Sequence, residues 1–141
     1  MKTIEDCIKF ANENRFCALA TLKNKQPKVR IVSLWFADET GFYFQTDLLK
    51  EFPHQLEQNK EVEVCFFKQE IILGCMLRIA GEVEFVNDSK LKERALRERP
   101  HLEYFKLNSK TPVLVIFRIP HGKIYYWRLE TNLRPKMYIE F

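Results

Sequence analysis

Residues 27–56 read PKVRIVSLWFADETGFYFQTDLLKEFPHQL, and this stretch decides the fold. The segment from Lys28 to Phe36 is rich in β-branched and aromatic residues, which favour a pleated strand. Residues 37–41 have the composition of a turn, in which Gly41 is free to take a positive φ. The next residues, Phe42 to Thr46, alternate between two faces as a second strand would. We therefore predict strand, turn and strand, followed by a helix whose apolar spacing is set by Leu48, Leu49, Phe52 and Leu56.

Two cations stand in this stretch, Arg30 in the middle of the first strand and Lys50 in the first helical turn. A cation is unfavourable at a helix N-terminus, because the helix dipole is already positive there. We expect strand pairing to bring Arg30 near Lys50 and the Thr46 hydroxyl, and the helix to point backbone N–H groups at the same place. Such a set would bind a strongly anionic group, such as a phosphate. The alternative interpretation is three unrelated polar residues on the surface.

The bulk composition is that of one globular domain, residues 1–141, with 46% hydrophobic and 13% aromatic residues. The net charge of +4 is mild and spread along the chain, so it allows an anionic ligand but does not indicate a nucleic-acid partner. No apolar run approaches the roughly 20 residues that span a bilayer. The first residues are acidic where a signal peptide needs an apolar core. We therefore expect a cytoplasmic protein without membrane contact.

Cysteine and histidine give no sign of a metal site. The four cysteines form no CxxC pair, and we expect them to be buried, reduced thiols: Cys7, Cys17, Cys65 and Cys75. The three histidines are scattered and are expected in turns or in solvent: His54, His101 and His121. We predict no metal, and no side chain presents itself as a catalytic group.

The rest of the chain predicts further strands interrupted by short helices. An N-terminal helix capped by Thr3 should end near Asn14, and Pro53 places the start of the second helix near Glu51 or Phe52. Asn87 to Ser89 is a helix-capping signal, and Leu102 with Phe105 suggests a further turn. Strands are predicted at Phe16–Leu22, Glu61–Phe67, Cys75–Val86, Pro112–Ile119, its hairpin partner Lys123–Leu129, and a short one within Arg134–Phe141. Gly81, inside one of them, indicates either a bulge or a close approach by a backbone or ligand. Such a series predicts a closed or nearly closed antiparallel barrel.

The order and spacing of these segments resemble the pyridoxamine 5'-phosphate oxidase-like family, the flavin-binding split β-barrels. The resemblance extends over nearly the whole chain. It implies a mainly β fold, a six- to seven-stranded antiparallel split barrel with short helices. The residues that carry it are Pro27–Arg30, Phe44–Thr46, Lys50, Gln55–Leu56 and Asn59, followed by a later block, Met76–Glu82.

The resemblance implies that FMN binds at the interface of a homodimer. Carried over residue by residue, one subunit would supply the phosphate site and a strand along the flavin ring: Arg30, Ile31, Val32, Ser33, Gln45, Thr46, Lys50 and Gln55. The second subunit would face the ring with Met76, Arg78 and Trp127. In such proteins the cofactor carries the redox chemistry, so the resemblance names no catalytic residue.

Departures from the family pattern bear on the reaction. Glu51 and Phe52 stand where the oxidase has an Arg-Lys pair, and Trp35 stands where it has a lysine. Its substrate-recognising Arg-x-His is replaced by Arg128-Leu129-Glu130, whose carboxylate would repel a substrate phosphate. We therefore predict an FMN-dependent oxidoreductase acting on another small molecule. The alternatives are a non-enzymatic binder of flavin, haem or deazaflavin, and a dimeric interaction module without cofactor.

Overall fold

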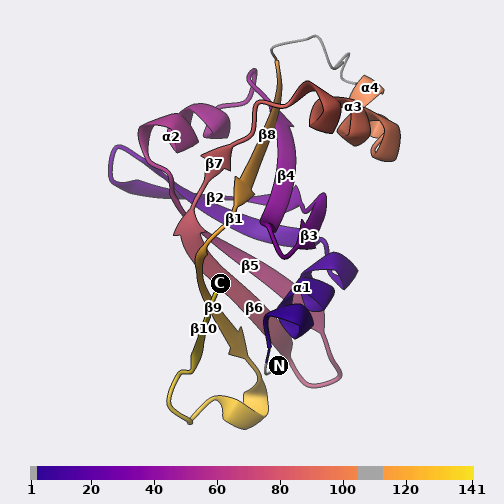
Figure 1. Ribbon diagram of the computed structural model, residues 1–141. Coiled ribbons are helices and arrows are strands. Elements are labelled where there is room, and N and C mark those ends of the chain that lie inside the picture. The colour runs from indigo at the N-terminus through magenta and orange to yellow at the C-terminus, as the bar shows by residue number, and fades with distance from the viewer. Residues whose placement is uncertain (1–2, 105–112) are drawn as a thin grey trace.

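The computed structural model describes residues 3–104 and 113–141. Two antiparallel sheets form the body of the molecule (Figure 1). The six-stranded sheet has the order β10-β9-β6-β5-β1-β2, and the four-stranded sheet has the order β3-β4-β8-β7. The strands are β1 (Phe16–Lys23), β2 (Gln26–Ser33), β3 (Phe36–Asp38), β4 (Gly41–Asp47), β5 (Glu61–Gln69), β6 (Gly74–Glu82), β7 (Glu84–Phe85), β8 (Leu114–Ile119), β9 (Gly122–Trp127) and β10 (Tyr138–Glu140).

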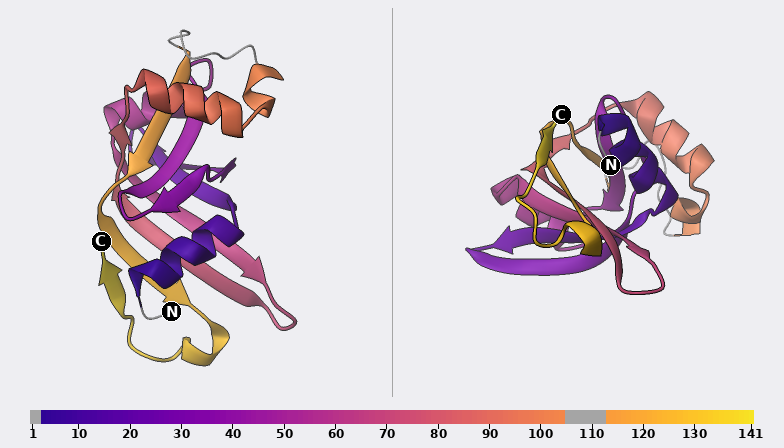
Figure 2. Two further views of the ribbon diagram at one scale, coloured as in Figure 1. Left: turned by 45° about the vertical axis from the view of Figure 1, so that its right-hand side comes forward. Right: turned by 90° about the horizontal axis from the view of Figure 1, so that it is seen from below.

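The described residues also form four α-helices and one 3₁₀ turn: α1 (Ile4–Glu13), α2 (Phe52–Gln58), α3 (Ser89–Glu98), α4 (His101–Tyr104) and η1 (Leu129–Thr131). The predicted cap of α1 is confirmed, because Thr3 and Asp6 form a capping box and Asn14 ends the helix. The cap of α3 is Asp88, as the sequence indicated. Figure 2 shows α3 and α4 together at one end of the molecule and α1 against the six-stranded sheet. No helix in residues 3–104 and 113–141 is long and apolar enough to cross a membrane.

The main core lies between the inner faces of the two sheets. Phe44 of β4 stacks on Phe117 of β8 with ring centroids 5.2 Å apart, and both rings are 1% exposed. From the six-stranded sheet the core receives fully buried residues: Leu19, Val64, Phe66, Leu77 and Ile79. Burial of each such side chain contributes about 1.5–3 kcal/mol, so this layer holds the two sheets together.

The other face of the six-stranded sheet is open in the single chain. Strand register places Ile31, Ala18, Cys65, Arg78, Tyr125 and Tyr138 in one row across it. A neighbouring row contains Phe67, Met76 and Trp127. Ile31 is 69% exposed and Phe67 is 51% exposed. We call this surface the open face. Because Cys65 lies on it and is only half-buried, the prediction that all four cysteines are buried is wrong for Cys65.

The predicted strand from Lys28 to Phe36 is wrong as a single strand. It breaks at Leu34 and Trp35, which are both buried and therefore cannot alternate between a core face and a solvent face. The Leu34 N–H donates to the Arg15 carbonyl, and the Trp35 N–H donates to the Tyr43 carbonyl, both at 2.9 Å. The chain thus passes here from the six-stranded sheet to the four-stranded sheet, and β4 pairs with β3 and β8 rather than with β2.

Two further expectations are corrected in the same way. The predicted strand Cys75–Val86 divides at Val83 into β6 and β7, which belong to different sheets. The segments around β8 and β9 are not hairpin partners, because β8 pairs with β4 and β7 whereas β9 pairs with β6 and β10.

The close approach expected at Gly81 is confirmed, since a Cβ there would lie 2.4 Å from the His121 carbonyl oxygen. Pro112 and Phe105, the ends of two predicted segments, lie outside the described residues.

The mainly β, antiparallel architecture is confirmed, and the short terminal strand within Arg134–Phe141 is present as β10. All strand pairings among the described residues lie within one sheet or the other. Closure into a barrel is therefore not confirmed.

Candidate functional site

A cavity of about 400 Å³ lies where β2, β4 and the segment after β4 meet the residues that follow α3. This size is within the range of small-molecule and cofactor sites. Seven of the eleven residues predicted to bind a cofactor line it: Arg30, Ile31, Val32, Ser33, Gln45, Thr46 and Lys50. The sequence therefore predicted most of one wall of this cavity.

One wall of the cavity is a free strand edge, because β2 is the outermost strand of its sheet. The Leu34 N–H bonds to the Arg15 carbonyl, which fixes the phase of the ladder between β1 and β2. Bonded and non-bonded pairs alternate in an antiparallel ladder, so the backbone groups of Ile31 and Ser33 point away from β1. Their N–H and C=O groups therefore remain available to a flat ligand that lies along β2.

Two residues that line the cavity each have a buried side-chain oxygen without a hydrogen-bond partner among the described residues, Thr46 Oγ1 and Gln45 Oε1. Thr46 is 5% exposed. Buried polar atoms are nearly always hydrogen-bonded, and an exception calls for an explanation. Since both atoms belong to residues that line the cavity, a polar ligand is the simplest partner for them.

The charge around the cavity is mainly positive. Arg30, Lys50 and Arg99 line it, together with one carboxylate, Asp47. Asp47 Oδ1 already accepts a hydrogen bond from the Leu49 N–H at 3.0 Å. Burial lowers the pKa of the Arg30 and Arg99 guanidinium groups, which is the direction expected for a cation removed from water. An anionic ligand group would offset this loss of solvation.

Arg30 and Lys50 come together for a different reason from the one predicted. No hairpin joins their strands; instead the crossing at Leu34 and Trp35 brings the end of β2 beside the end of β4. Lys50 lies before α2, which begins only at Phe52. The expectation that a helix N-terminus points at the phosphate is not supported, because α2 is seven residues long and has Pro53, without an N–H, in its first turn.

The structure adds cavity residues that the sequence did not indicate. Arg99, at the end of α3, donates from Nη1 to the Leu34 carbonyl at 2.8 Å and from Nη2 to Ser33 Oγ at 3.0 Å. His101 lines the cavity beside it, and partial burial together with the Arg99 charge lowers the pKa of this imidazole. Arg99 is 66 positions from Ser33, so no local spacing connects them. The one local signal was Pro100, which marked only the end of the helix.

The remaining predicted residues lie elsewhere. Gln55 is 5% exposed behind the cavity wall and accepts a hydrogen bond from Arg30. Met76 and Trp127 are paired neighbours on the open face. Arg78, on the same face, forms an ion pair with Glu63 and lines a second cavity of about 410 Å³. Met76, Arg78 and Trp127 do not line the first cavity within one chain, so a role for them there requires a second subunit.

The described residues contain no cluster of His, Cys, Asp or Glu side chains that could hold a metal ion. Burial raises the pKa of the Cys7 thiol to about 11 and that of Cys17 to about 12. Protonated thiols are poor nucleophiles and poor metal ligands, so these two cysteines are structural. His54 and His121 are exposed, as expected.

Comparison with known proteins assigns this geometry to a family. A pyridoxine/pyridoxamine 5'-phosphate oxidase of Agrobacterium fabrum (strain C58) is 34% identical over 80 residues, which are 56% of this chain but only 38% of that protein. A NimC/NimA family protein from Clostridium acetobutylicum has a similar structure with a TM-score of 0.81 and 22% identity, covering 97% of this chain and 92% of that one.

Two other solved structures of this fold have names that state a ligand. One is an FAD-binding protein from Mesorhizobium loti, with a TM-score of 0.70 and 19% identity over 88% of this chain and 93% of that one. The other is the haem storage protein HutZ from Vibrio cholerae, with a TM-score of 0.65 and 14% identity over 85% of this chain and 90% of that one. The sequence itself matches the family described as pyridoxamine 5'-phosphate oxidase over residues 3–128, and the chain belongs to that family.

Proposed function

We propose that this protein binds FMN in the cavity beside β2 and acts as a flavin-dependent oxidoreductase on a small molecule. The observation that carries the proposal is the buried hydroxyl of Thr46, which has no hydrogen-bond partner among the described residues and belongs to a residue that lines the cavity together with two cations, Arg30 and Lys50. A phosphate would accept hydrogen bonds from all three groups. The FAD-binding neighbour supports a flavin in this fold.

Each wall of the cavity would then have one task. Arg30, Lys50 and Thr46 would bind the phosphate, and the free backbone groups of Ile31 and Ser33 would bind the polar edge of the flavin ring. Bound flavin supplies the electron and hydride transfer, whereas the chain supplies orientation and exclusion of water. Arg99 would keep the ring-binding strand in place through its hydrogen bonds to Ser33 and Leu34.

We propose further that the active form is a homodimer paired through the open face. Phe16 and Ile31 both line the cavity and are 76% and 69% exposed, so the cavity opens beside this face. Large exposed apolar surfaces of this kind mark protein interfaces. Met76, Arg78 and Trp127 lie on the same face, and a second subunit would therefore bring them toward the first subunit's flavin. Light scattering at micromolar concentration should give twice the 17.0 kDa chain mass. A clean monomer would contradict the shared site.

Pyridoxamine 5'-phosphate is not the proposed substrate. Glu130 replaces the histidine of the oxidase and contacts Arg128, with Oε2 3.3 Å from Nε. Arg128 also lies 4.0 Å from the carboxylate of Glu70. Two carboxylates thus compete with any substrate phosphate for this guanidinium.

The visible spectrum of the purified protein tests the proposal directly. FMN gives the two flavin absorption bands, and its affinity follows from the quenching of flavin fluorescence on titration. The second candidate function is haem binding, which is favoured by one observation, the His101 imidazole at the cavity wall, since imidazole is a common haem ligand. A Soret band would support haem. A protein that binds neither cofactor would be an interaction module.

A further inference from the structure

A closed set of hydrogen bonds holds Arg30 in the cavity wall. Its Nη1 donates to the Leu19 carbonyl at 3.1 Å and to Thr21 Oγ1 at 2.7 Å. Its Nη2 donates to Gln55 Oε1 at 3.1 Å. The Thr21 hydroxyl donates to the same Gln55 oxygen at 2.5 Å. Thr21 and Gln55 are 2% and 5% exposed, so the bond between them is buried, whereas the bonds from Arg30 are partly buried.

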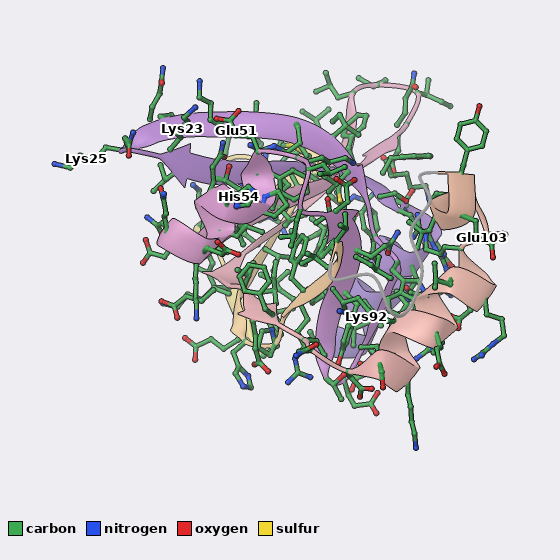
Figure 3. All side chains as sticks on the ribbon, turned by 90° about the horizontal axis from the view of Figure 1, so that it is seen from above. Lys23, Lys25, Glu51, His54, Lys92 and Glu103 are labelled. Atoms are coloured by element: carbon green, nitrogen blue, oxygen red, sulfur yellow. The ribbon has the colours of Figure 1, made fainter. Side chains whose placement is uncertain are left out.

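The chemistry of the three groups fixes the direction of every bond. Arginine can only donate, so Thr21 must accept from Arg30 and pass its own proton toward Gln55. Gln55 must therefore turn its carbonyl oxygen to both neighbours and its NH₂ group away from them. The Glu51 carboxyl lies near Gln55, since a hydrogen bond from Lys23 and, to a smaller extent, the interaction with Gln55 lower the pKa of Glu51. Figure 3 shows Lys23 and Glu51 close together beside α2.

With respect to the described residues, these bonds leave one edge of the Arg30 guanidinium without a partner. Three of its five N–H groups are used, and the two that remain belong to Nε and Nη2, which share one edge of the planar guanidinium. The flat face of the group lies over the Phe52 ring, with Cζ 5.1 Å from the ring centroid. Arg30 lines the cavity. An edge with two parallel N–H groups is the geometry that binds a phosphate in a bidentate way.

We propose that Thr21 and Gln55 are positioning residues that aim the free edge of Arg30 at the ligand phosphate and so set a preference for FMN over riboflavin. The inference rests on the proposed flavin site. Neither residue lines the cavity, so both act through Arg30. The neutrality of Gln55 is essential to this role, because a carboxylate at the same place would accept the same bonds but cancel the charge that the phosphate needs.

The decisive variant is Gln55→Glu, which keeps the shape and the acceptor oxygens of the network. FMN affinity should fall about tenfold or more, the loss expected for one charge-assisted hydrogen bond. Riboflavin affinity should stay within about twofold, since riboflavin has no phosphate. Gln58→Glu is the matched control, because Gln58 is exposed on the same helix and the chemical change is identical. It should alter neither affinity. Fluorescence quenching measures all four values, and the melting temperature shows that each variant is folded.

A second pair of variants tests Thr21. Thr21→Val removes the hydroxyl at nearly constant volume and should lower FMN affinity more than riboflavin affinity. Thr21→Ser restores the hydroxyl and should restore the FMN preference, which a purely structural role of the side chain would not produce. The affinity for inorganic phosphate, measured by titration into flavin-free protein, provides a further test. Phosphate should bind wild type and Gln58→Glu more tightly than Gln55→Glu.

Failure of this inference and failure of the proposed function are distinguishable. If wild type binds no flavin but the phosphate titration still separates Gln55→Glu from Gln58→Glu, the flavin assignment fails and the positioning role stands. If wild type binds FMN and Gln55→Glu binds FMN and riboflavin with equal losses, or with none, the positioning role is wrong.

Discussion

Substitution of Thr46 by valine should stabilise the flavin-free protein while weakening FMN binding. The Thr46 hydroxyl is buried, 5% of the residue being exposed, and its oxygen has no partner among the described residues. A buried polar group left unsatisfied costs about 1–3 kcal/mol. Valine has nearly the same volume, and a β-branched residue suits the β4 strand. We therefore expect a gain of about 1–2 kcal/mol in the free energy of unfolding, or about 3–6 °C in melting temperature.

Thr21→Val is the matched control for this experiment. The substitution is the same and the residue is equally buried, at 2% exposed, but the Thr21 hydroxyl accepts from Arg30 and donates to Gln55. Its removal leaves one Arg30 N–H without an acceptor and takes one of two donors from Gln55 Oε1, so we expect a loss of about 1–3 kcal/mol instead of a gain. Urea unfolding of both variants without flavin gives the two free energies, with opposite signs expected.

FMN affinity is measured on the same variants. FMN affinity of Thr46→Val should fall about tenfold, because one hydrogen bond to a charged group is lost. Two results would refute the reasoning. Destabilisation of Thr46→Val as large as that of Thr21→Val would mean that the Thr46 hydroxyl is satisfied in the free protein. Stabilisation without any loss of FMN affinity would mean that the hydroxyl does not contact the ligand.

Three further outcomes are expected. Arg30→Ala should weaken FMN binding about ten- to a hundredfold and Lys50→Ala somewhat less, with riboflavin nearly indifferent to both; equal losses for the two flavins in Arg30→Ala would exclude a phosphate contact. Oxidation of pyridoxamine 5'-phosphate should be negligible, because Glu130 repels its phosphate, and a coupled assay with turnover on the order of 1 per second would contradict this. Arg99→Ala should lower the melting temperature more than the control Arg97→Ala, because only Arg99 bonds to β2 and its crossing to the next sheet; equal melting temperatures would argue against that link.

The sequence predicted individual elements well and their connections less well. Alternation and turn chemistry identify β1 and β5, and the capping box identifies α1, because these signals are local. The passage of the chain from one sheet to the other at Leu34 and Trp35 has no such local signal. Two consecutive buried residues there satisfy strand propensity, so a single long strand is the natural reading of the sequence. Only tertiary packing decides that the chain turns from one sheet to the other.

The site was predicted as a set of residues, while its geometry followed from contacts distant in sequence. Arg30, Thr46 and Lys50 line one cavity as expected, although no hairpin pairing joins them. The internal bonds of Arg30 depend on Thr21 of the neighbouring strand, which the sequence did not indicate, and on Gln55 of α2, which was predicted to bind the cofactor itself rather than Arg30. Family resemblance transfers residue identities, whereas hydrogen-bond partners have to be read from the fold.

The half-buried arginines of the described residues divide into those that pair with a carboxylate and those that do not. Several pair with a carboxylate, and a carboxylate helps to raise the pKa of three of them: Arg78, Arg118 and Arg128. Arg30 and Arg99 are half-buried, have no carboxylate within ion-pair distance among the described residues, and have a pKa lowered by burial. Both line the same cavity. Burial of an unpaired charge is costly, and among the half-buried arginines of the described residues this cost falls on the two that line the cavity. An anion bound there would offset the cost for both guanidinium groups, so the same arrangement that weakens the empty fold strengthens its hold on a phosphate-bearing ligand.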